Sequence, residues 1–354
     1  MLNDQGLRTI EELSYCTSTT NLKKEEWIID FTTTTIGEIP VVSTELSRKD
    51  VTGRWKARWG IGRMKYIIKP GLYAVGSPDL SSPVFVSANY KMSFDYLRRD
   101  LNNISGWILV LDTKGINVWC AAGKGTFGTD ELINRLSLTR LKDIVNHRNL
   151  ILPQLGAPGV AAHKVKKATG FNIKYGPVLS KNIRTYIKNG FKATGDMRQV
   201  PFGIKQRAAL IPMELLPALK YVPYIFIFLV VMQLAIYRVF SLESLLLLIP
   251  FIGAIVMGCV VFQLILPLIP FHSFVIKGWI LGLIWSTIVY MYMPIGNWQA
   301  VGWYFLLPPV TAFLAENFTG STTFTHLSGV KLELKMGVPL MLVSLMIGII
   351  IQFF

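Results

Sequence analysis

The sequence predicts an α/β domain followed by an all-α transmembrane domain of about five helices. Three observations support this fold class. Short apolar runs alternate with amphipathic stretches up to about residue 200, long apolar stretches follow, and most of the positive charge precedes them. The mean hydropathy of +0.43 is too high for an ordinary soluble protein, whereas 16% charged residues are too many for a chain that lies wholly in the membrane.

Residues 1–55 are polar and show no regular apolar period, as in "TSTTNLKKEE" and "FTTTTIGEIP". We expect them to form an extended N-terminal polar arm that contributes little strand structure. The first residues also lack the apolar core of a signal peptide, so we expect the N-terminal part of the protein to remain in the cytoplasm.

Residues 56–200 show the alternation of strands and helices most clearly. Four short apolar runs bounded by Ser, Pro, Gly or Asp are typical of buried strands: "SPVFVSANY", "GWILVLDT", "NLILPQL" and "NIKYGPV". Helical patterns lie between them, with Ser93 and Thr129 as the expected N-caps of two helices and Gly170 as the expected end of a third. This order predicts a parallel sheet covered by helices, a Rossmann-like domain that binds its ligand at the carboxyl ends of the strands.

The stretch "NVWCAAGK" lies at that predicted edge and is expected to form a short helix, with Asn117 as N-cap and Gly123 as its C-terminal stop. Cys120 then lies in the first turn, where free backbone N–H groups and the helix dipole favour a thiolate. Small residues beside it would let a large flat ligand approach the backbone. A reactive or metal-ligating role is therefore one hypothesis for Cys120, and a buried small hydrophobe is the other.

The glycines after Cys120 do not predict a nucleotide site. Gly123, Gly125 and Gly128 satisfy G-x-G-x-x-G, but the preceding strand is expected to end about ten residues too early for the dinucleotide fingerprint. A Walker A loop fails as well, since Val118 stands where its first glycine belongs. The chain has no C-x-x-C motif, so we expect no iron–sulfur or zinc site of its own, and any electrons must come from a partner.

Beyond a linker over 201–218, the transmembrane domain is expected to cover 219–354. Its apolar stretches have the length of membrane-spanning helices: 219–240, 244–268, 274–292, 298–314 and 336–354. Lys277, Lys331 and Lys335 would lie in inside loops and Arg238 outside, which places the α/β domain in the cytoplasm and the C-terminus outside an inner membrane. We expect Glu243, Lys277 and Glu316 to reach the aqueous phase from helix ends, so that the domain serves for anchoring and for docking of partners.

The net charge of +15 is concentrated in the first 220 residues, because only four of the 36 Lys and Arg residues lie beyond them. Attraction to anionic lipid explains this excess. An acidic protein partner or a phosphate-bearing ligand is the alternative. Nucleic acid is not an expected partner, since no recognised motif accompanies the charge.

Taken together, "NVWCAAGK", "GLYAVGSPDLSSPVFVSANYKMSFDYLR" and "LPQLGAPGVAAHKVKKATGFNIKYGPV" resemble the HgcA family of mercury-methylating corrinoid proteins. The α/β part is also similar to the corrinoid-binding domain of the large subunit of the corrinoid iron–sulfur protein. The resemblance covers roughly residues 60–200, and the long apolar stretches after it match the HgcA arrangement.

This resemblance implies that residues 117–124 form a helix beneath a cobalamin-type corrinoid, held base-off with Cys120 as the axial ligand to cobalt and as the catalytic residue. The implied corrin contacts are Asn117, Val118, Trp119, Cys120, Ala121, Ala122, Gly123 and Lys124, flanked by Thr113, Gly125 and Thr126. The implied contacts of the nucleotide tail are Gly156, Ala157, Pro158, Gly159 and His163.

The implied function is that of a corrinoid-dependent methyltransferase, which passes a methyl group from the Cys120-ligated methylcobalt centre to mercury(II) and forms methylmercury. The implied partners are a ferredoxin-like iron–sulfur protein as electron donor and a methyltetrahydrofolate-linked methyl donor. A thiolate ligand favours transfer of a carbanion equivalent, and radical transfer is also compatible. The alternatives are a corrinoid methyl carrier of the acetyl-CoA pathway and a non-catalytic membrane corrinoid-binding module.

Overall fold

The structure is a computed structural model that describes residues 25–238, 245–293, 296–318 and 327–353. Contacts within the chain divide it into two compact units. The α/β unit comprises residues 1–57 and 61–200, and the helical unit comprises residues 58–60 and 201–354.

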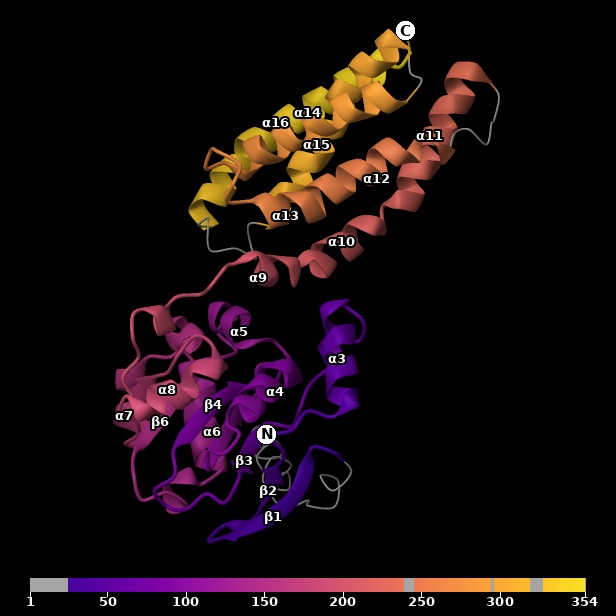
Figure 1. Cartoon of the computed structure of the whole chain (residues 1–354). Coiled ribbons are helices and arrows are strands. Elements are labelled where there is room, and N and C mark those ends of the chain that lie inside the picture. Colours follow the sequence, from indigo (N-terminus) through magenta and orange to yellow (C-terminus); the bar gives the residue numbers. More distant parts are fainter. Residues whose placement is uncertain (1–24, 239–244, 294–295, 319–326, 354) are drawn as a thin grey trace, which may run out of the picture. The chain divides into compact units, whose positions relative to one another are not determined.

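The α/β unit is built on a seven-stranded mixed sheet with the order β1-β2-β3-β5-β4-β6-β7 (Figure 1). The strands are β1 (Ile28–Thr34), β2 (Gly37–Val42), β3 (Gly71–Val75), β4 (Val84–Ala88), β5 (Gly106–Leu111), β6 (Asn149–Leu152) and β7 (Asn172–Tyr175). The four strands expected from the sequence, β4 to β7, pair in parallel, while β3 runs antiparallel to β5. The α/β class is confirmed, but the sheet is mixed because β1, β2 and β3 extend it on one side.

The prediction of a strand-poor arm over residues 1–55 is wrong for its described part. Residues 28–42 form an antiparallel hairpin, and β2 joins the sheet beside β3. Threonine is β-branched and suits an edge strand with one wet face, so the polar composition of β1 is compatible with a strand. Trp27 and Val42 are buried in the core beneath the hairpin.

Helices cover both faces of the sheet. Residues of β5 alternate between two cores, with Leu109 and Leu111 in one and Ile108 and Val110 in the other. The helices of this unit are α3 (Arg48–Arg58), α4 (Lys91–Asp100), α5 (Val118–Lys124), α6 (Thr129–Leu138), α7 (Ala162–Thr169) and α8 (Ile183–Lys188).

Of the caps predicted for α4, α6 and α7, two are wrong and one is confirmed. The N-cap positions of α4 and α6 are Tyr90 and Gly128, and neither Ser93 nor Thr129 caps its helix. The Thr129 hydroxyl instead accepts a hydrogen bond from the backbone N–H of Ala161 at 2.8 Å, a long-range contact that a local pattern does not encode. Gly170 ends α7 in the left-handed conformation, as expected.

A buried ion-pair network fastens α3 to α4. The Arg98 guanidinium bonds Asp50 at 2.7 Å and Asp95 at 2.9 Å, and the Lys91 ammonium lies between the same two carboxylates. Burial alone would raise the pKa of Asp50, but the hydrogen bond and charge of Lys91 and the charge of Arg98 outweigh it and lower the pKa to about 2.

The helical unit contains α9 (Ile204–Ala208), α10 (Ile211–Leu219), α11 (Val222–Tyr237), α12 (Leu248–Val256), a π-helical turn (Met257–Val261), α13 (Phe262–Ile265), α14 (Phe274–Tyr292), α15 (Asn297–Asn317) and α16 (Leu327–Ile351). Among the described residues, four helical segments are long and apolar enough to cross a membrane: Ile204–Ala235, Leu248–Ile265, Phe274–Tyr292 and Gly329–Ile351. The fifth expected span, 298–314, is helical within α15 but is not one of these four.

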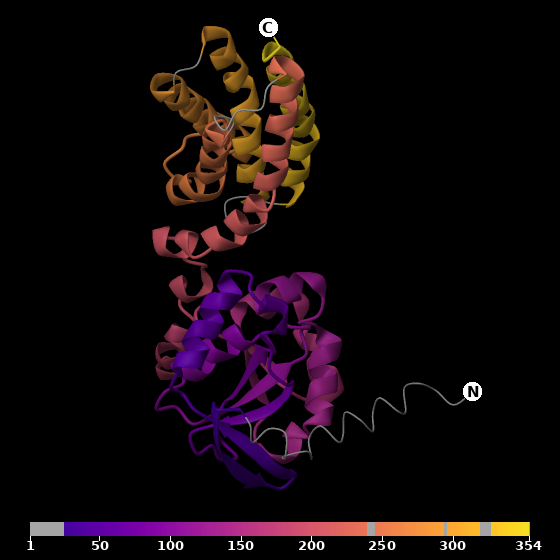
Figure 2. The ribbon, with the colours of Figure 1, turned by 90° about the vertical axis from the view of Figure 1, so that its right-hand side faces the viewer.

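The helix α15 packs between α14 and α16 (Figures 1 and 2). Small residues allow the close approach: a Cβ on Gly278 would lie 2.6 Å from the Ala312 Cα, and one on Gly282 would lie 2.3 Å from the Pro308 Cα. This packing corrects the expectation for two charged side chains. Lys277 and Glu316 do not reach the surface but are 5% and 2% exposed, while Glu243 lies outside the described residues.

Candidate functional site

The helix α5 presents Cys120 at the edge of the sheet where parallel strands end. It begins as predicted: Asn117 is extended at the N-cap, and its side-chain oxygen accepts a hydrogen bond from the Cys120 N–H at 2.9 Å. It ends at Gly125 and not at the predicted Gly123. Gly125 has φ 79°, the left-handed conformation that closes a helix, whereas Gly123 continues it.

The residues of α5 divide into a buried and an exposed face. Ala121 and Ala122 lie in the core, whereas Trp119 is 44% exposed and Cys120 is an exposed free thiol. The hypothesis of a buried small hydrophobe at Cys120 is therefore wrong. Lys124 is exposed on the same helix, and Thr126 is half-buried after it.

Gly123 leaves a bare patch of backbone on the exposed side of the helix. A Cβ at this position would meet no atom within 4 Å, so the packing of the protein itself does not require glycine there. A glycine inside a helix costs about 1 kcal/mol relative to alanine. Gly123 therefore lowers the stability of the helix at a position close to the exposed Cys120 thiol. Without a side chain there, a flat ligand can approach the backbone closely.

The loop before α5 is held from beneath by Asn89. The Asn89 side-chain oxygen accepts hydrogen bonds from the backbone N–H groups of Thr113 and Gly115 at 3.1 and 3.0 Å. The Thr113 hydroxyl lies 2.9 Å from the same oxygen and 2.6 Å from the Ile116 carbonyl oxygen. Thr113 is fully buried, so in this structure it positions α5 and has no surface to offer a ligand.

Asp112 completes this support. Its carboxylate accepts a hydrogen bond from the Asn89 amide at 3.2 Å and one from the Lys114 backbone N–H at 3.0 Å. Burial alone would raise the pKa of Asp112, but the hydrogen bonds and charge of Lys114 outweigh it and lower the pKa. Asp112 is therefore a fixed acceptor for the loop.

The expected tail-binding residues pack behind α5. In the 3₁₀ segment Gln154–Gly159, a Cβ on Gly156 would come 2.5 Å from the Phe127 ring. A Cβ on Gly159 would come 2.1 Å from the Phe127 carbonyl oxygen and 3.0 Å from the Ala122 Cα. These two glycines thus let the segment press against α5. Ala157 is half-buried, and Pro158 and His163 are exposed.

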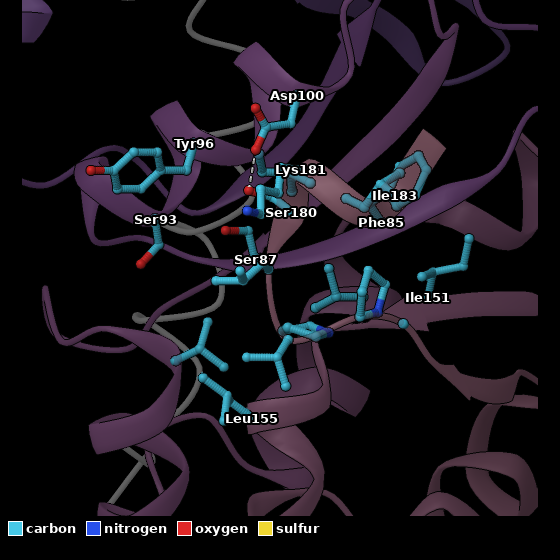
Figure 3. Close-up of a pocket in the computed structure, with 18 of the residues that line it drawn as sticks. Phe85, Ser87, Ser93, Tyr96, Asp100, Ile151, Leu155, Ser180, Lys181 and Ile183 are labelled. Carbon is cyan, nitrogen blue, oxygen red and sulfur yellow. Dashed lines mark hydrogen bonds between the residues drawn. The ribbon is translucent and has the colours of Figure 1, made fainter. Parts of the chain in front are cut away.

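A cavity of about 460 Å³ opens next to the start of α5. Asn117, Val118 and Trp119 are among the residues that line it. The rest of the lining comes from β4, α4, the end of β6, the segments after β6 and β7, and the start of α8, with Phe85, Ile151 and Ile183 labelled in Figure 3. Its polar groups include Ser87, Ser93 and Ser180, of which Ser180 donates to the Asp100 carboxylate at 2.5 Å. Its apolar lining includes Phe85, Val86, Leu97, Ile151, Pro153, Leu155, Pro177, Val178, Leu179 and Ile183.

Sequence reasoning missed this cavity, although a signal was available. Ser87, Pro153 and Gly176 stand at or just beyond the carboxyl ends of neighbouring parallel strands, which is where ligands bind in open α/β sheets. The cavity does not include Gly156–Gly159 or His163.

The fold and the site together define an α/β domain that presents a thiol-bearing helix at the ligand edge of its sheet, joined to a helical unit that can cross a membrane. Residues 63–187 match the family described as the CO dehydrogenase/acetyl-CoA synthase delta subunit. This region contains α5 and the whole cavity, and it excludes the hairpin, α3 and the helical unit.

The chain is also similar to the gamma subunits of archaeal acetyl-CoA decarbonylase/synthase complexes. It is 30% identical to that of Archaeoglobus fulgidus over 126 residues, which are 35% of this chain and 26% of the relative. It is 31% identical to that of Methanopyrus kandleri over 123 residues, 34% of this chain and 26% of the relative. The chain thus spans about a quarter of the length of these relatives.

Proposed function

We propose that the α/β unit binds a corrinoid against the exposed face of α5 and that the protein is a membrane-anchored, corrinoid-dependent methyltransferase with mercury(II) as the methyl acceptor. The observation that carries the proposal is the exposed Cys120 thiol beside the bare backbone of Gly123. The resemblance to the HgcA family and the similarity to acetyl-CoA decarbonylase/synthase subunits support it.

The residues present suit a corrinoid in two respects. A thiolate is a soft ligand appropriate to a transition metal, and Cys120 is accessible to one. The adjoining cavity has room for an extended group and shares Asn117, Val118 and Trp119 with α5. We therefore assign the nucleotide tail to this cavity, with Gly156, Ala157, Pro158 and Gly159 backing the helix and His163 outside the cavity.

A bound corrinoid supplies a cobalt centre that can carry and release a methyl group. Cys120 would donate electron density to that centre and favour release of the methyl group with its bonding electrons, the form that an electrophile such as mercury(II) accepts. Asn117 fixes the first turn through the Cys120 N–H, and the buried Ala121 and Ala122 keep the thiol facing outward. The chain holds the thiol in place before any ligand arrives, which limits the ordering cost of binding.

Two partners follow from this function. A ferredoxin-like iron–sulfur protein would return electrons, because the chain has no cysteine motif for a cluster of its own. A methyltetrahydrofolate-linked donor would restore the methyl group. We place the α/β unit on the cytoplasmic side of an inner membrane, following the distribution of Lys and Arg.

A second candidate is a corrinoid methyl carrier of the acetyl-CoA pathway, which the names of the relatives favour. The four membrane-capable segments and the exposed thiol favour the first candidate. The third candidate is a corrinoid-binding module that does not transfer methyl groups.

One pair of variants tests the proposal. Cells that produce Cys120→Ala should form no methylmercury, whereas cells with Cys259→Ala, which removes a buried thiol of the helical unit, should retain production. Normal production by Cys120→Ala would contradict the proposed chemistry. Absorption and electron paramagnetic resonance spectra of the purified, corrinoid-loaded proteins test the ligand separately, since a cobalt–thiolate signature that persists in Cys120→Ala would refute the ligand assignment.

A further inference from the structure

A cluster of exposed apolar side chains lies on α3 and on the segment that follows it. Ten large apolar side chains are exposed among the described residues up to Val200, and six of them lie within residues 51–67: Val51, Trp55, Trp59, Ile61, Met64 and Ile67. The other four, Ile29, Leu80, Trp119 and Val200, are scattered along the chain. Single exposed apolar residues are ordinary on a protein surface, whereas a group of them indicates a binding surface.

The opposite face of α3 fixes the helix to the α/β unit. Asp50 belongs to the ion-pair network with α4. Gly53 lies against Tyr66, since a Cβ at Gly53 would come 2.7 Å from the Tyr66 ring. Val51 and Trp55 are four residues apart and therefore share the face that stays exposed, where Trp55 is 63% exposed.

The chain after α3 is held at both ends. The Ile61 N–H donates to the Lys56 carbonyl oxygen at 2.8 Å, and Ile67 pairs with Tyr90 in an antiparallel bridge. Ile61 and Met64 lie between these contacts and are 63% and 64% exposed. Because the backbone is already ordered, these side chains can meet a partner with a low ordering cost.

This surface adjoins the loop that carries α5. The strand β3 runs antiparallel to β5 with Gly71 opposite Val110, so the residues just before β3 lie at the edge where β5 ends. There a Cβ on Gly115 would come 2.6 Å from the Ile67 side chain. The exposed apolar cluster thus lies at the ligand edge of the sheet.

Basic residues surround the exposed apolar side chains. The sequence between residues 48 and 69 has a single acidic residue, Asp50, and eight basic ones: Arg48, Lys49, Arg54, Lys56, Arg58, Arg63, Lys65 and Lys69. Lys91 and Arg98 bond the Asp50 carboxylate, so it does not offset this charge, and Glu26 pairs only with Lys49 among the described residues. The surface therefore suits a partner that is anionic and also accepts apolar side chains.

We propose that α3 and residues 59–67 bind the surface of a bilayer that contains anionic lipid. Tryptophan favours the interface between headgroups and acyl chains, and Lys and Arg beside it are attracted to anionic headgroups. This contact requires neither Cys120 nor a corrinoid, so it goes beyond the proposed function.

The covalent link to the helical unit favours lipid over the competing occupant, an acidic protein. The α/β unit ends at Val200, and the first membrane-capable segment begins at Ile204. A tether this short keeps lipid at a high local concentration around the surface, whereas a soluble protein must bind from dilute solution.

A fluorescent label at residue 61 tests the proposal in the full-length protein. In a protein whose cysteines are all replaced by serine, Ile61→Cys carries an environment-sensitive nitrobenzoxadiazole label. Ile29→Cys is the matched control, because Ile29 of β1 is 64% exposed. In phosphatidylcholine nanodiscs that also contain phosphatidylglycerol, emission of the label at residue 61 should shift to shorter wavelength relative to pure phosphatidylcholine. The label at residue 29 should not shift.

Salt and charge variants identify the cause of the shift. Raising the salt to about 1 M, where the Debye length is about 3 Å, should reverse it. Lys56→Gln with Lys65→Gln should lower the ratio of docked to undocked protein about fivefold for each lysine removed. Lys164→Gln with Lys167→Gln removes the same charge from α7, which bears none of the ten exposed apolar side chains, and should leave the shift in place.

Hydrogen exchange of the unsubstituted protein gives a second measurement that needs no labelled variant. Backbone amides of residues 59–67 should exchange more slowly in nanodiscs with phosphatidylglycerol than in pure phosphatidylcholine, and those of α7 should exchange equally in both.

Three results would overturn the proposal. One is the same exchange and emission at residues 59–67 in both kinds of nanodisc, and another is an equal emission shift at residues 29 and 61. The third is a response of the residue-61 label to added polyglutamate but not to phosphatidylglycerol, which would assign the surface to an acidic protein. None of these measurements depends on methylmercury production, so their failure is distinct from failure of the proposed function.

Discussion

Asn89 and Thr113 meet beneath the loop that carries α5, where the Asn89 side-chain oxygen lies 3.1 Å from the Thr113 backbone nitrogen and 2.9 Å from its hydroxyl oxygen. The same oxygen accepts a bond from Gly115 at 3.0 Å. The side chain of Asn89, which directly follows β4, thus determines where the loop after β5 places α5 and its thiol.

Asn89→Ala should loosen this loop. It leaves two buried backbone N–H groups without an acceptor, and each costs about 1–3 kcal/mol. We expect a lower melting temperature and a faster reaction of Cys120 with a bulky thiol reagent, measured on the full-length protein in detergent. Asn102→Ala removes an exposed asparagine and should change neither quantity, and equal effects of the two variants would contradict the positioning role.

Gly123→Ala should separate stability from ligand binding. No neighbour lies within 4 Å of the new methyl group, so the helix should gain about 0.5–1 kcal/mol of stability. The same methyl group would stand on the proposed corrinoid-binding face, so the dissociation constant for an added corrinoid should rise. Unchanged affinity would show that the ligand does not touch this face.

Gly159→Ala is the matched substitution behind the helix. Its methyl group would overlap the Phe127 carbonyl oxygen, and we expect a loss of about 1–3 kcal/mol. Thermal unfolding should therefore rank Gly123→Ala above the unsubstituted protein and Gly159→Ala below it.

Leu155→Trp should test the cavity as the tail site. Leu155 lines the cavity, and the larger ring would reduce the space beside α5. Corrinoid affinity, measured by spectroscopic titration, should fall in this variant. His163→Ala should leave corrinoid affinity unchanged, because His163 is exposed outside the cavity. If His163→Ala weakened binding and Leu155→Trp did not, the nucleotide tail would bind at α7 and not in the cavity.

Asp50→Asn should change how stability depends on pH. The pKa of Asp50 is lowered to about 2 in the folded protein, below its unfolded value of about 3.9. The stabilisation, about 2–3 kcal/mol, is therefore present above about pH 4 and is lost as the pH falls toward 2. The variant should lose less stability over this acidic interval when thermal unfolding is followed as a function of pH.

At neutral pH the same variant should be less stable by about 3–5 kcal/mol, because Lys91 and Arg98 would remain buried with Asp95 as the one carboxylate left to them among the residues that the structure describes. Glu26→Gln breaks an exposed pair with Lys49 and should cost at most about 1 kcal/mol. A similar cost for both variants would mean that the buried network contributes no more than a surface pair.

The sequence predicted some of the features that depend on neighbours along the chain, although the local caps expected at Ser93 and Thr129 were wrong. The cap at Asn117 and the stop at Gly170 are local, and both are confirmed. The end of α5 was misplaced because Gly123 and Gly125 are both compatible with a helix end. In the structure Gly125 is the residue that adopts the left-handed conformation. The β1–β2 hairpin was missed because β1 is an edge strand whose residues are exposed or half-buried, so its polar composition lacks the apolar pattern of a core strand.

Features that depend on distant segments were not predictable from a single sequence. Gly156 and Gly159 look like loop glycines until Phe127 is seen against them. Glu316 and Lys277 lie near helix ends in the sequence, and only the packing of α15 between its neighbours shows that they are buried.

The contact of Gly159 with the Phe127 carbonyl and the Ala122 Cα has a consequence for engineering. At Gly159 the atoms that limit the approach of this segment to α5 are main-chain atoms, so repacking of core side chains will not relieve this contact. To change the atom that donates to the proposed cobalt, an engineered variant must replace Cys120 itself. The new side chain must be long enough to reach the metal from the backbone of α5.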